Sequence, residues 1–138
     1  MQQENCVFCK IVSGKIPSSK VYEDNHVIAI LDIMPAAKGH CLIVPKKHFD
    51  DVASTPKVTI AAMMEASKKV GKSQSQALGA TGYNLLVNNG KDAGQAVFHT
   101  HLHVIPRSKH DGLVIKWKPR RYHEGELKLH QEKLASFL

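Results

Sequence analysis

The segment that most constrains the fold is residues 97–105, VFHTHLHVI, in which histidine recurs at every second position. The β-branched and aromatic residues around the histidines favour a strand, and Pro106 ends the run. Because side chains alternate between the two faces of a strand, His99, His101 and His103 would share one face, roughly 6.5–7 Å apart. The opposite face, which we predict to be the core side, would consist of Phe98, Thr100, Leu102 and Val104.

A row of three imidazoles has three interpretations. It could be a solvated strand face that happens to hold histidines, a metal site, or a site of phosphoryl transfer. Neutral imidazole suits the last two, since it acts as a metal ligand, a nucleophile and a general acid or base near pH 7. Three histidines in register favour the two chemical interpretations over the first.

The length and composition indicate a single globular domain over residues 1–138. Within it we distinguish a core at about residues 5–107 and a basic C-terminal extension at about 108–138. No apolar run is long enough to span a membrane, and the polar first residues do not resemble a signal peptide, so we expect a cytoplasmic protein. The net charge of +7 favours phosphate-bearing partners, whether nucleotide or nucleic acid.

The pattern along the chain predicts an α+β fold, with a mostly antiparallel sheet and one main helix packed on a face. We expect strands at residues 20–23, 26–32, 40–45 and 83–88, besides the histidine strand. The main helix would begin at Thr55, as N-cap, and Pro56, and end at Gly79. Shorter helices are expected at residues 6–14 and 126–138.

Cys6 and Cys9 form a Cys-x-x-Cys pair, which can bind a soft divalent ion as two thiolates. A closed site needs two more ligands, and the sequence offers His40, His48 and the three strand histidines. Spacing alone does not choose among them. The alternatives are a pair of buried free thiols and, less favoured, a redox pair, because no strand precedes the motif as a thioredoxin-like unit requires.

Two further segments could bind anions. The loop at residues 89–96 contains two glycines and leads into the histidine strand, so its backbone N–H groups could converge on an anion; the alternative is an ordinary long hairpin loop. Residues 107–121 are basic, and Trp117 and Tyr122 could stack on bases, which is a weak indication of nucleic-acid binding. We consider nucleic acid an unlikely partner, because basic tails are usually solvated.

The histidine run, followed by two apolar residues, resembles the signature of the histidine triad family of nucleotide hydrolases and transferases. Asp32, residues 39–48, Asn88 and the Gly94-Gln95 pair also fall where that family has similar residues. The resemblance covers roughly residues 5–107.

The resemblance implies a structural zinc site in the N-terminal part of the chain. Bacterial members with this Cys-x-x-Cys motif bind zinc through two further histidines, one after a Pro-Lys-Lys segment and one that leads the triad. The corresponding zinc ligands here are Cys6, Cys9, His48 and His99.

The resemblance also implies a mechanism. His101 would attack the α-phosphate of a purine nucleotide and form a nucleotidyl-histidine, which water then hydrolyses. His103 and His40 would donate hydrogen bonds to phosphate oxygens, and one of them would protonate the leaving group. The activity most implied is that of a purine nucleoside phosphoramidase. The alternatives are a dinucleoside polyphosphate hydrolase and a nucleotide-binding regulatory protein with little turnover.

Nucleotide binding would fall to residues that match the family at other positions. Asp32 resembles its ribose-binding carboxylate, and Ile33 is a candidate for the base pocket. Ile28, Ile30 and Leu42 are further candidates that could equally be plain core. The phosphate-side contacts would come from Asn88, Gly94 and Gln95.

The chain departs from the family at Ala96, where Ser or Thr is common. The missing hydroxyl removes a donor that would help hold the phosphate, which affects the rate and the preferred leaving group. Members of the family commonly form homodimers, and C-terminal segments of some reach the neighbouring subunit's pocket. We therefore expect a homodimer, in which Trp117 is the residue that could reach across.

Overall fold

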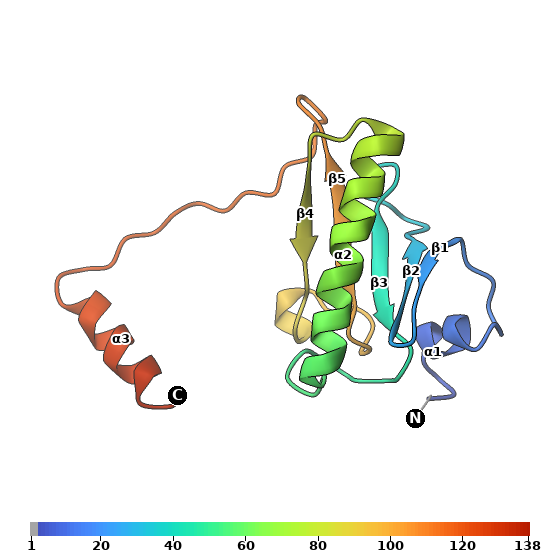
Figure 1. The fold of residues 1–138 in the computed structure, drawn as a ribbon. Coiled ribbons are helices and arrows are strands. Elements are labelled where there is room, and N and C mark those ends of the chain that lie inside the picture. Colours follow the sequence, from blue (N-terminus) through green and yellow to red (C-terminus); the bar gives the residue numbers. More distant parts are fainter. Residues whose placement is uncertain (1–2) are drawn as a thin grey trace.

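The computed structural model describes residues 3–138 and confirms the predicted α+β architecture (Figure 1). Five strands form one sheet in the order β1-β2-β3-β5-β4, and every neighbouring pair is antiparallel. The elements are α1 (Val7–Val12), β1 (Lys20–Glu23), β2 (Val27–Leu31), β3 (Cys41–Pro45), α2 (Lys57–Leu78), β4 (Gly82–Leu86), the 3₁₀ helix η1 (Lys91–Ala93), β5 (Leu102–Arg107) and α3 (Glu126–Ala135).

The main helix, α2, covers one face of the sheet. Met63, Ala66 and Val70 recur at helical spacing and are buried against the sheet. The predicted N-cap is wrong: Pro56 occupies that position, and the Thr55 hydroxyl instead donates to the Asp51 carbonyl. Thr55 is also hydrogen-bonded to the histidine segment, and this tertiary contact takes the side chain away from the helix end.

The two faces of the central strands have different environments. On β3, Cys41 and Ile43 lie in the cluster under α2, whereas Leu42 and Val44 lie in a second cluster with α1. Leu42 is the register partner of His103 on β5, so the histidine side of β5 belongs to the face that α1 covers. The candidate base-pocket residues Ile28, Ile30 and Leu42 are part of this second core cluster.

The histidine strand begins later than predicted. β5 starts at Leu102, and residues 97–101 form an irregular segment that leads into it. The reason is a non-local hydrogen bond: the Thr100 N–H donates to the Phe49 carbonyl at 2.7 Å and so leaves the sheet ladder. Phe98, predicted on the core side, is therefore 52% exposed, while Thr100 is buried as expected.

The C-terminal extension leaves the body of the molecule as an extended arm that ends in α3 (Figure 1). No residue of α3 is buried. The division into a core and a basic extension stays a prediction. In the described residues, 3–138, no helix has both the length and the hydropathy that crossing a bilayer requires.

Candidate metal and catalytic site

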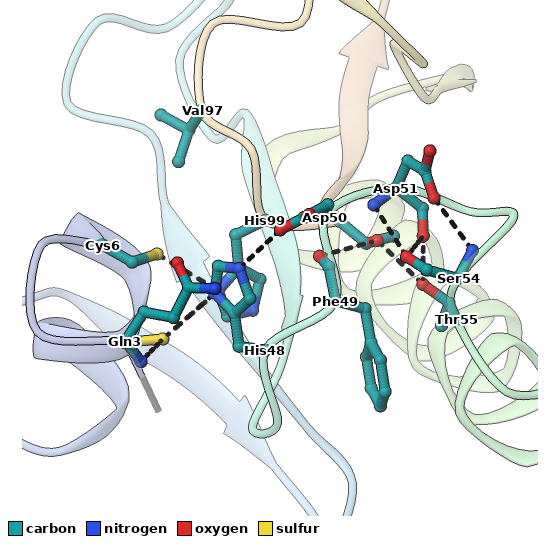
Figure 2. A network of polar contacts seen from close by, with 12 residues as sticks. Gln3, Cys6, His48, Phe49, Asp50, Asp51, Ser54, Thr55, Val97 and His99 are labelled. Carbon is teal, nitrogen blue, oxygen red and sulfur yellow. Dashed lines mark hydrogen bonds and ion pairs between the residues drawn. The ribbon is translucent and has the colours of Figure 1, made fainter. Parts of the chain in front are cut away.

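Four side chains from three separate parts of the sequence meet between α1 and the start of β5. The sulfur atoms of Cys6 and Cys9 and ring nitrogens of His48 and His99 all lie within 4.8 Å of one another. Figure 2 shows Cys6, His48 and His99 at one end of a polar network that continues through Asp50 and Asp51. Three of the four residues are buried, and His48 is partly buried.

The outer nitrogen of each histidine in this cluster has a hydrogen-bond acceptor. His99 Nε2 lies 3.0 Å from the Pro45 carbonyl oxygen, and His48 Nε2 lies 2.8 Å from Asp50 Oδ1. Since only a protonated nitrogen can donate to these oxygens, Nε2 carries the hydrogen in both rings. Nδ1 of each ring therefore presents a lone pair to the cysteines, which is the arrangement of a metal-ligating histidine and its supporting acceptor.

The distances within the cluster fit a tetrahedral zinc ion. Zn–S and Zn–N bonds of ordinary length at a tetrahedral angle separate sulfur from nitrogen by about 3.6 Å. The sulfur–nitrogen distances are 3.3 Å for Cys6–His99, 3.4 Å for Cys9–His48 and 3.6 Å for Cys9–His99. Burial lowers the pKa of His99 to about 4, so its ring is neutral and able to bind a metal at pH 7.

The middle histidine of the run is held by the backbone of the first. His101 Nδ1 lies 2.7 Å from the His99 carbonyl oxygen, which can only accept, so Nδ1 carries the hydrogen. His101 Nε2 is then left with its lone pair. This is the protonation state that a nucleophilic imidazole requires, and it is set by one short backbone hydrogen bond.

A relay of hydrogen bonds fixes the other two histidines of the site. The Ala36 N–H donates to His40 Nδ1 at 3.0 Å, so the hydrogen of His40 is on Nε2. That Nε2–H donates to His103 Nδ1 at 2.9 Å, which leaves the hydrogen of His103 on Nε2. Burial is the main cause that lowers the pKa of His103, to about 4, and burial also lowers the pKa of His40. Both rings are therefore neutral at pH 7.

Asp32, His40 and His103 form a second group whose ligand atoms are close enough for a metal ion. Its protonation does not suit one. The facing nitrogens of the two histidines share a proton, and the remaining nitrogen of His40 already accepts the Ala36 N–H. To bind a metal here, His40 would have to present an unprotonated Nε2. The hydrogen bond from the Ala36 N–H to Nδ1 favours the other tautomer, in which Nε2 carries the hydrogen.

Asp32 and Ile33 lie beside this relay. Asp32 Oδ1 accepts the Met34 N–H at 2.8 Å, and Oδ2 lies 3.8 Å from His40 Nε2. Ile33 is 94% exposed, and Met34 is also exposed. Both apolar side chains are therefore accessible to a ligand beside the Asp32 carboxylate.

The other predicted nucleotide contacts lie in the loop that precedes the histidine segment. Gly94 has φ +87°, a left-handed conformation that favours glycine, and its carbonyl accepts from Asn88 Nδ2 at 3.3 Å. The Gln95 side chain holds this loop in place through hydrogen bonds at both ends of its amide group. Its Oε1 accepts the Gly90 N–H at 2.8 Å, and its Nε2 donates to the Asp50 carbonyl at 2.6 Å.

Sequence reasoning did not identify two of the residues that build the site. Phe8 packs against the rings of His99 and His101, and Asp50 supports His48. Phe8 stands between the two cysteines in the sequence and was indistinguishable there from an ordinary core residue. Asp50 stands two residues after His48, and its position in the sequence did not mark it as the hydrogen-bond partner of that ring.

Most of the chain matches one known protein family. Residues 13–110 match the family described as the HIT domain. The chain belongs to the histidine triad, or HIT, family. The matched range includes the three histidines that gave the first indication of function.

Relatives of this HIT protein include enzymes. It is 43% identical over 130 residues to the adenylylsulfatase HINT3 of Arabidopsis thaliana, an alignment that covers 94% of this chain but only 64% of the relative. It is 41% identical over 132 residues to the adenosine 5'-monophosphoramidase HNT1 of Saccharomyces cerevisiae, covering 94% of this chain and 81% of the relative.

A solved structure of a relative contains zinc. The zinc-bound histidine triad protein of Mycobacterium smegmatis is 40% identical to this HIT protein and superposes with a TM-score of 0.78, over 97% of this chain and 98% of the relative. The bound zinc is a property of that relative. The four-residue cluster of the present chain makes zinc binding here a specific proposal.

Proposed function

We propose that this HIT protein hydrolyses purine nucleotide conjugates at the α-phosphate through a covalent nucleotidyl intermediate on His101. The observation that carries the proposal is the hydrogen bond from His101 Nδ1 to the His99 carbonyl, which leaves Nε2 unprotonated. Nε2 attacks phosphorus, an N–P bond forms, and the bond to the leaving group breaks. Water then attacks the phosphorus, the N–P bond breaks, and the nucleoside monophosphate is released.

His103 and His40 have different roles in this proposal. The Nε2–H of His103 is not used by the relay, so it donates to a phosphate oxygen on which charge grows in the transition state. His40 donates to His103 instead of to substrate, so we assign it a positioning role. Because both rings are neutral, the proton that an amine leaving group requires comes from solvent.

The remaining assignments concern binding. Asp32 accepts hydrogen bonds from the ribose hydroxyls, and Ile33 contacts the base, which accounts for its exposure in the free protein. Asn88 and Gly94 contact the phosphate, while Gln95 holds their loop in place. Cys6, Cys9, His48 and His99 bind one structural zinc ion.

A substrate panel tests the proposed reaction. Adenosine 5'-phosphoramidate and adenylyl sulfate should be hydrolysed to AMP with a higher kcat/KM than a dinucleoside polyphosphate, because the exposed loop residue Ala96 offers no hydroxyl to a longer phosphate chain. If Asp32 accepts hydrogen bonds from the ribose hydroxyls, Asp32→Asn should reduce the ratio of kcat/KM for the ribonucleotide to kcat/KM for its 2'-deoxy analogue. Tight AMP binding without turnover of any substrate would favour a regulatory protein, and a preference for the dinucleotide would favour the polyphosphate hydrolase.

The proposal includes a homodimer. Among the described residues β4 pairs with β5 alone, so its outer backbone edge is unpaired, and its residues Tyr83, Leu85 and Leu86 are exposed. An apolar edge strand of this kind readily pairs with another copy. Sedimentation equilibrium should give twice the monomer mass, and Leu85→Lys should shift the protein towards monomer. A single-chain mass at all concentrations would refute the dimer.

A further inference from the structure

Helix α1, which contains Cys9 and is preceded by Cys6, also touches the proposed nucleophile. Phe8, which is 7% exposed, lies on α1 between Cys6 and Cys9. Its ring packs against the His101 ring with centroids 5.0 Å apart, and meets the His99 ring edge-on at 5.8 Å. The short segment of Cys6 and α1 thus contributes two sulfur atoms to the metal cluster and packs an aromatic ring against the proposed nucleophile.

His99 makes a second connection between the same two places. Its Nδ1 faces the sulfur atoms of Cys6 and Cys9, and its backbone carbonyl accepts the hydrogen bond from His101. Any shift of His99 within the cluster therefore moves the only acceptor that fixes the His101 tautomer in the described part of the chain.

α1 has little stability of its own. It has six residues, and its N-terminus has no side-chain cap. Isolated helices of this length are not stable in water, so α1 depends on its tertiary contacts. Its residue Cys9 and its N-cap residue Cys6 belong to the cluster, together with His48 and His99. Four bonds to one ion would hold α1, and with it Phe8, against the histidine segment.

We propose that the metal cluster and the nucleotide site are thermodynamically coupled, with Phe8 and the His99 carbonyl as positioning groups for His101. Metal bound by Cys6, Cys9, His48 and His99 favours the orientation of His101 that receives the α-phosphate. This inference rests on the proposed function, because it requires AMP, the expected product, to bind beside His101. Coupling of two binding sites is reciprocal, so AMP must strengthen metal binding by the factor by which metal strengthens AMP binding.

The experiment measures zinc affinity with and without nucleotide. Zinc-loaded protein is titrated with a chromophoric chelator, first alone and then in saturating AMP, and saturation is established beforehand by calorimetry. AMP should lower the zinc dissociation constant by about tenfold, a typical size for a coupling between sites. An unchanged zinc dissociation constant in protein that binds AMP would overturn the coupling. Failure of zinc-loaded protein to bind AMP would instead count against the proposed function.

Variants test the route of the coupling. Phe8→Leu keeps an apolar side chain but removes the ring that packs against His101, and it should reduce the AMP effect on zinc affinity to about twofold or less. Ile11→Val trims a partly buried residue of the same helix and should retain the full effect. Zinc content of each variant is measured first. An undiminished AMP effect in zinc-loaded Phe8→Leu would exclude Phe8 from the route.

Discussion

Replacing His101 with Asn should lower kcat for adenosine 5'-phosphoramidate by roughly 10⁴-fold or more, the scale typical of a lost nucleophile. The asparagine side chain cannot present an sp² nitrogen lone pair to phosphorus, although it is close to histidine in size. The AMP dissociation constant should change far less, because His103 and the loop at Gly94 remain. Steady-state kinetics and calorimetry measure the two quantities.

His110 provides a matched control for this substitution. It is exposed, lies outside the site, and has φ +62°, a conformation that asparagine adopts readily. His110→Asn should therefore keep both full activity and full stability. A His101→Asn variant with near-normal turnover would exclude His101 as the nucleophile.

Replacing Cys6 and Cys9 together with Ser should remove the metal and much of the stability. The natural protein should contain one zinc ion per chain, and the double variant should contain none, because serine does not provide the thiolates of the site. At a zinc concentration about 1,000 times the dissociation constant, bound metal contributes about 4 kcal/mol to the free energy of unfolding. The variant should lose that contribution. Elemental analysis and urea unfolding measure the two effects.

Cys41 is the matched control for the cysteine substitutions. It is also a buried free cysteine, but it lies under α2 with its thiol 3.4 Å from the Gly39 carbonyl. Cys41→Ser keeps a donor for that carbonyl and should retain one zinc per chain. Stoichiometric zinc in the Cys6→Ser, Cys9→Ser variant would refute the assigned ligands.

The sequence predicted the part of the site that depends on local alternation. His103 lies on β5, on the face away from α2, because its neighbours Leu102 and Val104 take the core side. The pattern failed at Phe98, since the backbone of Thr100 bonds to Phe49 and the strand starts at Leu102. Periodicity contains no information about such a bond between distant segments.

The sequence predicted less of the metal cluster. The Cys-x-x-Cys spacing predicts two ligands, but the other two come from segments that meet it only in the folded chain: His99 is 93 positions from Cys6. The resemblance to a family suggested His48 and His99, and spacing could not. The role of Phe8 was hidden for the same physical reason, because its contact with His101 is set by where α1 docks.

The most direct test is to identify the residue that becomes covalently modified during turnover. The protein is mixed with adenosine 5'-phosphoramidate, quenched rapidly in alkali to preserve an N–P bond, digested, and mapped by mass spectrometry. We predict an adenylyl group on His101 that is absent from His101→Asn. An adenylyl group on any other residue, or hydrolysis that proceeds with no modified peptide at any time point, would contradict the mechanism.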